Sequence, residues 1–390
     1  MKRVYILSLL QNSVSFAKAL AVSNLTLFFV LIVFSFLSCL PRQRPGNNIS
    51  SGQPVEYVEY IMEGGAFELP VAGATGYAAV NLLVYGAASE NANVINILSA
   101  GQGFTILREE NSWWHIEVNN TRGWVMHKYC LINLPDIVPS IVYNNTNTYS
   151  SLFRSSEIDI PNITGRALYE GRDFNVRLGR EEFISPVLYA MAPKVFASQQ
   201  AALADGNTLI IYEAFRPAEA HDYLHENFSY LVNTNPLVRS GITSDSFNIR
   251  WFLAAAPYNH QRGTAIDVHL GKIDSWERRT TGAYTYIHIT KCTEFHMQSP
   301  MHELSVLSAV FDSSVHARST TAWMDVVISD KATLGTILLQ RYCTDAGLTP
   351  LASEWWHFND LENTAVAIEM ENEGRYHIER TYSRPPERLN

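Results

Sequence analysis

The sequence NHQRGTAIDVHL, residues 259–270, predicts a turn that leads into a strand. Gly263 gives the backbone the conformational freedom that such a turn needs. Beyond the turn the side chains alternate, so Ile266 and Val268 share one face while Asp267 lies on the other. Burying an aspartate alone is costly, and a metal ion is one partner that would compensate its charge. The pattern therefore indicates a possible metal ligand at Asp267.

Histidines close to this strand and far beyond it could complete a ligand set. His260 lies at the mouth of the strand, and SEWWHF, residues 353–358, follows about ninety residues later. His260, Asp267 and His357 would supply three protein ligands and leave a position open, as catalytic zinc sites do. Glu354, three residues before His357, could accept a proton from the attacking water and later give it to a leaving amine.

The spacing of Glu354 and His357 requires a particular local shape. Residues at i and i+3 share one side of a helical turn but not of a flat strand, so we expect a bend at Trp355-Trp356. The indole side chains of Trp355 and Trp356 are expected to line the site. They would then lower its local dielectric and strengthen the charge interactions inside.

These motifs resemble those of the zinc D-alanyl-D-alanine dipeptidases, which include the vancomycin-resistance dipeptidases and belong to the wider hedgehog-like D,D-peptidase group. The family carries His-x-x-Gly-x-Ala-x-Asp and, later, Glu-Trp-Trp-His, here residues 260–267 and 354–357. It also has an Arg-Pro turn upstream, here YEAFRP, residues 212–217. The resemblance covers the chain from about Leu134 to its C-terminus.

The resemblance implies a hedgehog/D,D-peptidase-like α+β catalytic domain that binds one Zn²⁺ per chain. Its implied ligands are His260, Asp267 and His357. Glu354 would act as the general base and acid, and Arg216 would face the oxyanion that develops on the carbonyl. The alternative for Arg216 is a simple ion pair with Glu213.

Four further positions need separate interpretation. The wider group has serine two residues before the first histidine, where this chain has Tyr258, so we expect altered substrate choice rather than altered metal binding. His269 shares a strand face with Asp267 and is interpreted as a neighbour. His221 and His225, one helical turn apart, have a spacing that can bind metal. No third ligand supports that reading, so a solvated helix face is the preferred interpretation.

The N-terminal forty residues differ in character from the rest. Lys2 and Arg3 precede an apolar stretch at residues 19–39, typical of an export signal or membrane anchor. FLSC, ending at Cys39, resembles a bacterial lipobox; the alternative is an uncleaved anchor helix. Residues 1–39 are therefore interpreted as a signal peptide or lipoprotein anchor and residues 40–76 as a linker. Either alternative places the protein in the cell envelope, as a membrane-anchored lipoprotein or periplasmic protein.

Short strands and turns between residues 77 and 134 predict a small β-barrel. It resembles the bacterial SH3-like domains through ILSAGQGF at 97–104, Trp113-Trp114, and RGWV at 122–125. That family often binds the cell wall. The tryptophans could form a ligand platform or fill the core: core is preferred for Trp124, and strand alternation should expose one of Trp113 and Trp114.

Composition excludes some functions. The chain has 390 residues and a net charge of −9 without a basic run, which argues against a nucleic-acid partner. We therefore predict an α+β protein with an SH3-like domain at 77–134 and a zinc dipeptidase-like domain at 135–390. Its predicted activity is hydrolysis of D-Ala-D-Ala in cell-wall peptide metabolism. The alternatives are a D,D- or L,D-carboxypeptidase acting on peptidoglycan stem peptides, or a non-catalytic wall-binding lipoprotein.

Four local predictions complete the set. Residues 185–204 should form a helix capped by Ser185. Residues 366–378 should form an edge strand pair, and residues 384–390 a frayed tail. Cys343 should be a small buried residue of a helix.

Overall fold

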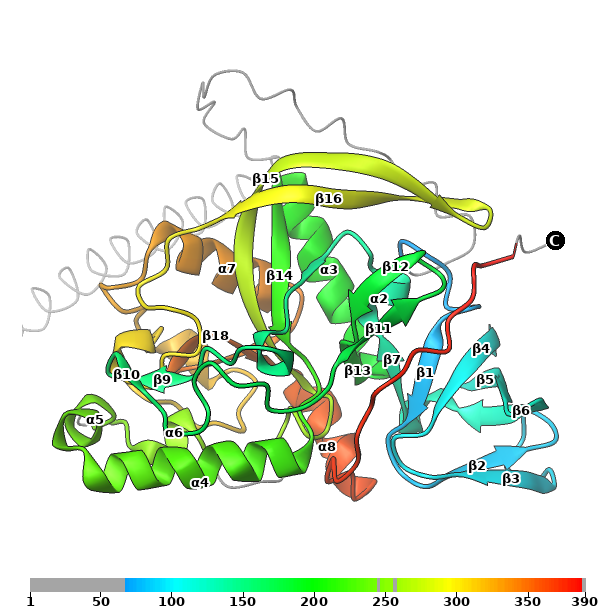
Figure 1. The fold of residues 1–390 in the computed structure, drawn as a ribbon, viewed down its shortest axis with the longest axis horizontal. Coiled ribbons are helices and arrows are strands. Elements are labelled where there is room, and N and C mark those ends of the chain that lie inside the picture. The colour runs from blue at the N-terminus through cyan, green and yellow to red at the C-terminus, as the bar shows by residue number, and fades with distance from the viewer. Residues whose placement is uncertain (1–66, 244–245, 255–257, 388–390) are drawn as a thin grey trace, which may run out of the picture. The chain divides into compact units, whose positions relative to one another are not determined.

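The computed structural model describes residues 67–243, 246–254 and 258–387. The predicted signal or anchor at 1–39, with Cys39, lies outside the described residues, as does most of the predicted linker at 40–76. Among the described residues, no helix combines the length and apolar character needed to cross a bilayer. The structure is mixed α+β, with a β-rich N-terminal region followed by a second sheet and its helices (Figure 1).

The N-terminal region is an eight-stranded antiparallel sheet with the order β13-β7-β1-β4-β5-β6-β2-β3. In chain order its strands are β1 (Thr75–Ala78), β2 (Leu82–Tyr85), β3 (Val94–Leu98), β4 (Gly103–Glu110), β5 (Trp113–Val118), β6 (Thr121–Met126), β7 (Cys130–Asn133) and β13 (Pro186–Leu188). Alternate side chains of β4 and β5, such as Phe104 and Ile116, are fully buried, which is the pattern expected for a small sheet closed around its own core.

The tryptophans of this region are mainly structural. Trp114 is fully buried, whereas its neighbour Trp113 is half-buried and packs edge-on against Tyr85. Trp124 is 9% exposed and stacks on His115. The preference for a core position at Trp124 is confirmed, as is the expectation that one of Trp113 and Trp114 points outward.

The second sheet has the order β17-β18-β15-β14-β8, with β16 paired to β15. Its strands are β8 (Val142–Tyr143), β14 (Asn207–Glu213), β15 (Ala265–Thr281), β16 (Tyr284–Glu294), β17 (Thr349–Leu351) and β18 (Glu354–Asn359). β15 lies at the centre, and its far half continues with β16 as a long hairpin beyond the other strands (Figure 1). The predicted strand after Gly263 is therefore the central strand of the sheet that carries the site.

Helices cover one face of this sheet. α3 (Ala192–Ala204) packs on β14, and α7 (Leu334–Asp345) packs on α3, β15 and β18 (Figure 1). Ile266 and Val268 of β15 are fully buried in the main hydrophobic core. Cys343 is a fully buried residue of α7, as predicted.

Shorter elements complete the architecture. The remaining α-helices are α2 (Leu134–Ile137), α4 (Ala218–Thr234), α5 (Pro236–Gly241), α6 (Ile249–Phe252) and α8 (Leu361–Glu369). Two small strand pairs are β9 (Arg154–Ser155) with β10 (Ile158–Asp159), and β11 (Arg172–Asn175) with β12 (Arg180–Phe183). Five 3₁₀ turns in the described residues are η1 (His127–Tyr129), η2 (Thr146–Thr148), η3 (Tyr189–Met191), η4 (Val306–Ser308) and η5 (Ala322–Asp325).

One predicted helix begins later than expected, and one predicted strand pair is wrong. The helix expected over residues 185–204 begins only at Ala192, because Pro186–Leu188 pair with β7 and extend the first sheet. The edge strands expected over residues 366–378 do not form, because α8 runs to Glu369 after Asp360 caps its N-terminus. In the first case pairing with another segment outweighs the local pattern, whereas in the second a local helix with its own N-cap does so.

The C-terminal segment is anchored to the first sheet rather than frayed at Arg384. The Tyr77 hydroxyl donates to the Arg380 carbonyl at 2.9 Å, and the Arg384 amide donates to the Gly73 carbonyl at 2.7 Å. The predicted tail is therefore wrong at its first residue, since Arg384 also forms an ion pair with Glu117.

Candidate metal centre and active site

The structure brings the three predicted metal ligands together. Asp267 Oδ1 lies 3.1 Å from His260 Nε2 and 2.9 Å from His357 Nδ1, and the two nitrogens are 3.2 Å apart. His260 comes from the turn before β15, and Asp267 pairs directly with His357 across β15 and β18. Pairing of these two strands thus closes a separation of ninety residues.

Hydrogen bonds on the outer side of each imidazole decide which ring nitrogen carries the proton. His260 Nδ1 lies 2.6 Å from the Ala214 carbonyl oxygen, and His357 Nε2 lies 2.9 Å from Asn359 Oδ1. Both oxygens can only accept, so these outer nitrogens donate and the inner nitrogens carry lone pairs. Asn259 Nδ2 donates to the same Asn359 oxygen at 2.7 Å, which fixes that amide.

Three lone-pair donors therefore converge on one point with no proton assigned between them. His260 and Asp267 are buried, and the His357 side chain is 12% exposed, so water can do little to relieve their repulsion. Two imidazole nitrogens and one carboxylate oxygen form a donor set that suits Zn²⁺ and leaves a fourth position open. The residues present thus fit the metal that the sequence predicts.

The charge state of Asp267 agrees with this arrangement. Burial opposes ionisation of the carboxyl, but the charge and hydrogen bonds that His260, His302 and His357 supply when a proton lies between them and the carboxylate outweigh burial and hold its pKa well below the usual range; a bound cation would act in the same direction. Asp267 is accordingly an anion at neutral pH. A buried anion of this kind requires cationic or hydrogen-bonding partners.

Glu354 lies beside the three ligands, but its surroundings shift its pKa in the opposite direction to that of Asp267. Its Oε2 lies 3.8 Å from His357 Nδ1, and the side chain lines the same cavity. Burial raises the pKa of Glu354 to about 8, with His357 opposing and Asp267 reinforcing the rise. A divalent cation nearby would favour the ionised form.

The predicted bend at Trp355-Trp356 is confirmed by an interruption in strand pairing. Pro350 pairs with Phe358, but the next residue of β17, Leu351, pairs with Glu354, so residues 355–357 are left out of the register. This irregularity turns Glu354 and His357 toward the same side, which a flat strand could not do.

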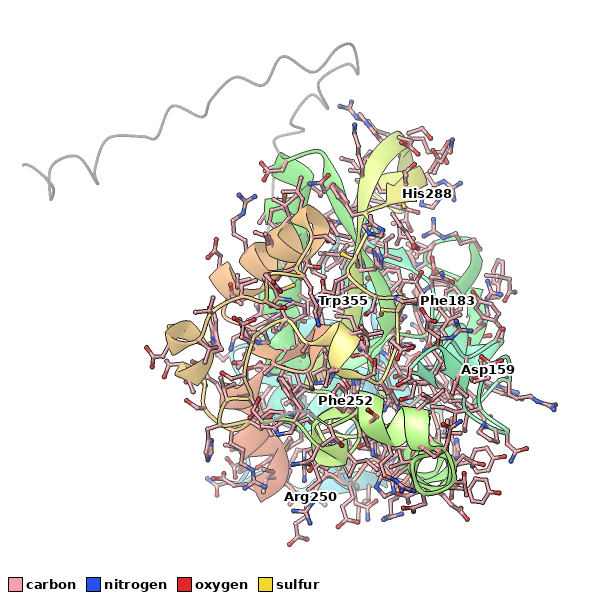
Figure 2. All side chains as sticks on the ribbon, turned by 90° about the vertical axis from the view of Figure 1, so that its left-hand side faces the viewer. Asp159, Phe183, Arg250, Phe252, His288 and Trp355 are labelled. Carbon is pink, nitrogen blue, oxygen red and sulfur yellow. The ribbon has the colours of Figure 1, made fainter. Side chains whose placement is uncertain are left out.

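The predicted position of the two indoles is wrong. Trp355 and Trp356 are fully buried and do not line the cavity, and Trp355 Nε1 donates to Ser299 Oγ at 3.0 Å. In Figure 2 Trp355 lies near the middle of the view, away from the outline of the molecule. Trp251 lines the cavity instead. The two indoles therefore pack in the hydrophobic core, on the side of β18 away from the cavity.

Arg216 forms the ion pair with Glu213 that its sequence context allowed, and it also lines the cavity. Nε and Nη2 donate to Glu213 Oε2, and Nη2 also lies 3.5 Å from Asp267 Oδ2. Nη1 donates to His221 Nδ1 at 3.2 Å. One of the five N–H groups of a guanidinium then remains without an acceptor among the described residues. Because Arg216 lines the cavity, that N–H could reach a bound ligand.

His221 is a residue of the cavity and a partner of Arg216 that the sequence interpretation missed. The side chain is buried, not on a solvated face, and its Nε2 donates to the Ala254 carbonyl at 2.8 Å. Burial and the neighbouring Arg216 lower its pKa to about 3, so the imidazole is neutral and its Nδ1 accepts from the guanidinium. His225 is only partly buried and belongs to no ligand cluster of the described residues.

The cavity beside the ligands has a volume of about 330 Å³. Tyr258, which replaces the expected serine, lines it and is 44% exposed, with its ring stacked against His221. Its position therefore suits an effect on substrate choice. The lining of the cavity also includes Arg216, Trp251, Phe252, His260, Asp267, Glu354 and His357.

A second group of possible ligands shares Asp267 with the first and consists of Glu213, Asp267 and His302. The Arg216 guanidinium already supplies a cation there, because it pairs with both carboxylates. His269, in contrast, lies outside both groups and packs edge-on against Trp355. The structure therefore supports one metal position among the described residues, with His269 as a neighbour.

Comparison with known proteins concerns the N-terminal region. Residues 80–131 match the sequence model of the bacterial SH3 domain family. A curated relative, the putative N-acetylmuramoyl-L-alanine amidase YrvJ of Bacillus subtilis (strain 168), is 39% identical over 83 residues. That match covers 19% of this chain and 16% of the relative, so the chain spans only a small part of the relative's length. The predicted bacterial SH3-like region is thus confirmed for residues 80–131.

Proposed function

We propose that this protein is a zinc-dependent peptidase of the cell envelope that hydrolyses the dipeptide D-Ala-D-Ala. The observation that carries the proposal is the convergence of three lone-pair donors, His260, Asp267 and His357, with Glu354 beside them in one cavity. Zinc bound by these residues would polarise the scissile carbonyl and make a water molecule more acidic. The resemblance of the sequence motifs to zinc D-Ala-D-Ala dipeptidases points to the substrate.

Glu354 would move the proton during the reaction. The water oxygen adds to the carbonyl carbon while the Glu354 carboxylate accepts its proton, and the same proton then passes to the amine nitrogen as the C–N bond breaks. The raised pKa of Glu354 makes its carboxylate a better base than an exposed glutamate. Burial and proximity to Asp267 raise this pKa, and a bound zinc ion would lower it again, so together they would leave a carboxylate that can accept and return a proton near neutral pH.

Arg216 would stabilise the negative charge that develops on the carbonyl oxygen. Its guanidinium is held by Glu213 and His221, so little reorganisation is needed when the charge appears. The remaining Nη1–H is the group available to the oxyanion. Holding Arg216 in place is therefore the role of its ion pair with Glu213.

The size of the cavity favours a small substrate. About 330 Å³ is near the lower end of the range for ligand sites, roughly 300–1,000 Å³, and suits a dipeptide. The bacterial SH3 match favours the second candidate, a D,D- or L,D-carboxypeptidase acting on stem peptides, because a wall-binding domain would bring the site to polymeric substrate. The name of the relative, a putative amidase, also suits a peptidoglycan-related role. A non-catalytic lipoprotein would not need Glu354 beside the ligands.

Direct incubation distinguishes these functions. Purified protein with one equivalent of zinc is given D-Ala-D-Ala or a stem pentapeptide that ends in D-Ala-D-Ala, and released D-alanine is measured. We expect release from the dipeptide. Release from the pentapeptide alone would favour the carboxypeptidase, and release from neither would favour the wall-binding protein, whose affinity for isolated cell walls can be measured in the same preparation.

Replacing Arg216 by lysine is expected to lower kcat by about 10²–10³-fold, the typical cost of losing one oxyanion donor. Lysine keeps the charge but cannot pair with Glu213 and reach the substrate at once. Steady-state kinetics measures the effect, and Arg341→Lys, at a surface ion pair with Asp205, is the matched control. A kcat within twofold of the unmodified protein would exclude Arg216 from the chemical step.

A further inference from the structure

His302 is a buried histidine behind the metal centre. It has no exposed surface, its ring stacks on Phe153 at 4.2 Å between centroids, and the Trp356 ring packs edge-on at 5.9 Å. It does not line the cavity, so it has no route to a substrate. Its nearest charged neighbour is Asp267, whose Oδ2 lies 3.2 Å from His302 Nε2.

The backbone holds His302 firmly in this position. Its φ of 60° is in the left-handed region, which costs free energy for a residue other than glycine. The His302 carbonyl accepts from the Arg154 amide at 3.1 Å. The adjacent Glu303 carboxylate accepts from the amides of Ser156 and Glu157. These contacts fix the 302–303 segment and compensate the unfavourable conformation.

Neither ring nitrogen of His302 forms a hydrogen bond in this structure. Leaving a buried polar group without a hydrogen bond is unfavourable, so a partner for the ring is strongly favoured. The Nε2–Asp267 Oδ2 distance is already that of a hydrogen bond, although the angle is not. A small rotation of either side chain would complete the bond.

The two oxygens of Asp267 face different partners. Oδ1 faces His260 and His357, whereas Oδ2 faces Arg216 Nη2 at 3.5 Å and His302 Nε2 at 3.2 Å. A group that donates to Oδ2 therefore prevents the carboxylate from rotating and keeps Oδ1 directed at the metal position. Such outer partners of metal ligands typically affect metal affinity or activity by 10–100-fold.

We propose that His302 is a positioning residue of the zinc centre, donating Nε2–H to Asp267 Oδ2 so that Oδ1 remains directed at the metal. The inference rests on the proposed zinc site. It assigns a role to a histidine in the MHELS segment, residues 301–305, which lies between the two metal-ligand motifs in the sequence. Because Arg216 already occupies the space between Glu213 and Asp267, His302 serves the one metal position and not a second one.

Two substitutions separate positioning from packing. His302→Phe keeps the ring that stacks on Phe153 and removes the donor, while His302→Gln restores an N–H donor at a similar reach. The zinc Kd of each full-length protein is measured by competition with a chromogenic chelator, and the Co²⁺-loaded proteins are compared by visible absorption. The melting temperature of the metal-free proteins is recorded in parallel. Leu339→Val, at a fully buried position of α7, controls for loss of stability alone.

We expect His302→Phe to weaken zinc binding by about 10–100-fold and to alter the Co²⁺ spectrum. His302→Gln should recover part of the affinity, and Leu339→Val should lower only the melting temperature. An unchanged zinc Kd in His302→Phe, with the unmodified protein binding zinc, would overturn this inference and leave the proposed function intact. Failure of the unmodified protein to bind zinc would overturn both.

Discussion

Replacing Glu354 by glutamine is expected to reduce kcat for D-Ala-D-Ala by about 10²–10⁴-fold, the usual contribution of a positioned general base. Glutamine has nearly the same shape but cannot accept a proton. Glu354 Oε2 lies 3.8 Å from His357 Nδ1, beside the ligand atoms but not among them. Zinc should therefore remain near one equivalent per chain, in the glutamine variant as in Glu354→Ala.

Metal content and kcat must be measured on the same preparations. Glu362→Gln is the matched control: this glutamate is on α8, paired with Lys194, and takes no part in the cavity. It should leave both quantities unchanged. An active Glu354→Gln protein would remove Glu354 from the mechanism. An inactive protein without zinc would show instead that the residue is needed for metal binding.

Replacing His357 by alanine is expected to abolish stoichiometric zinc binding and, with it, activity. Structural zinc sites bind with roughly 10–16 kcal/mol shared over four ligands, so one ligand is worth about 3 kcal/mol, or more than 10²-fold in Kd. Only three protein ligands meet here, which makes the loss of one harder to tolerate. Zinc content after dialysis and zinc Kd are the direct measurements.

Thermal stability gives an independent reading of the same change. Zinc at 1,000 times its Kd stabilises the folded state by about 4 kcal/mol, because it binds the folded chain alone. The melting temperature of the unmodified protein should therefore rise with zinc and that of His357→Ala should not. His288→Ala is the control, since this histidine lies on the β15–β16 hairpin, well away from Trp355 in Figure 2. An equal zinc response in His357→Ala would show that the metal binds elsewhere.

Local patterns gave the three candidate ligands that the structure brings together, and the resemblance of the motifs gave them their expected role in a zinc site. A single aspartate in an apolar alternating strand, a histidine at its turn and a Glu-x-x-His pair are local patterns. Each pattern restricts which way the side chains of its own segment can point and which buried charges need a partner. The bend at Trp355-Trp356 followed from the same reasoning, because Glu354 and His357 could not otherwise face one site. The alternation around Trp113 and Trp114 was readable for the same physical reason.

Patterns within one segment could not predict contacts with distant segments. Residues 186–188 look like the start of a helix, but unpaired backbone groups on β7 make a strand more favourable there. Trp355 and Trp356 look like cavity walls, but the core behind β18 buries both. His221 looks like a surface residue of a helix until Arg216 and Ala254 are seen to enclose it.

The chain alone therefore indicated which side chains could bind a metal and move a proton, because those abilities depend on residue type and local spacing. Tertiary structure was needed to show the tautomers of His260 and His357, since Ala214 and Asn359 set them from other segments. It was also needed to find His302, which sequence separates from Asp267 by a long hairpin. Ligand identity is a property of individual residues, whereas the orientation of each ligand depends on hydrogen bonds that exist only after the chain has folded.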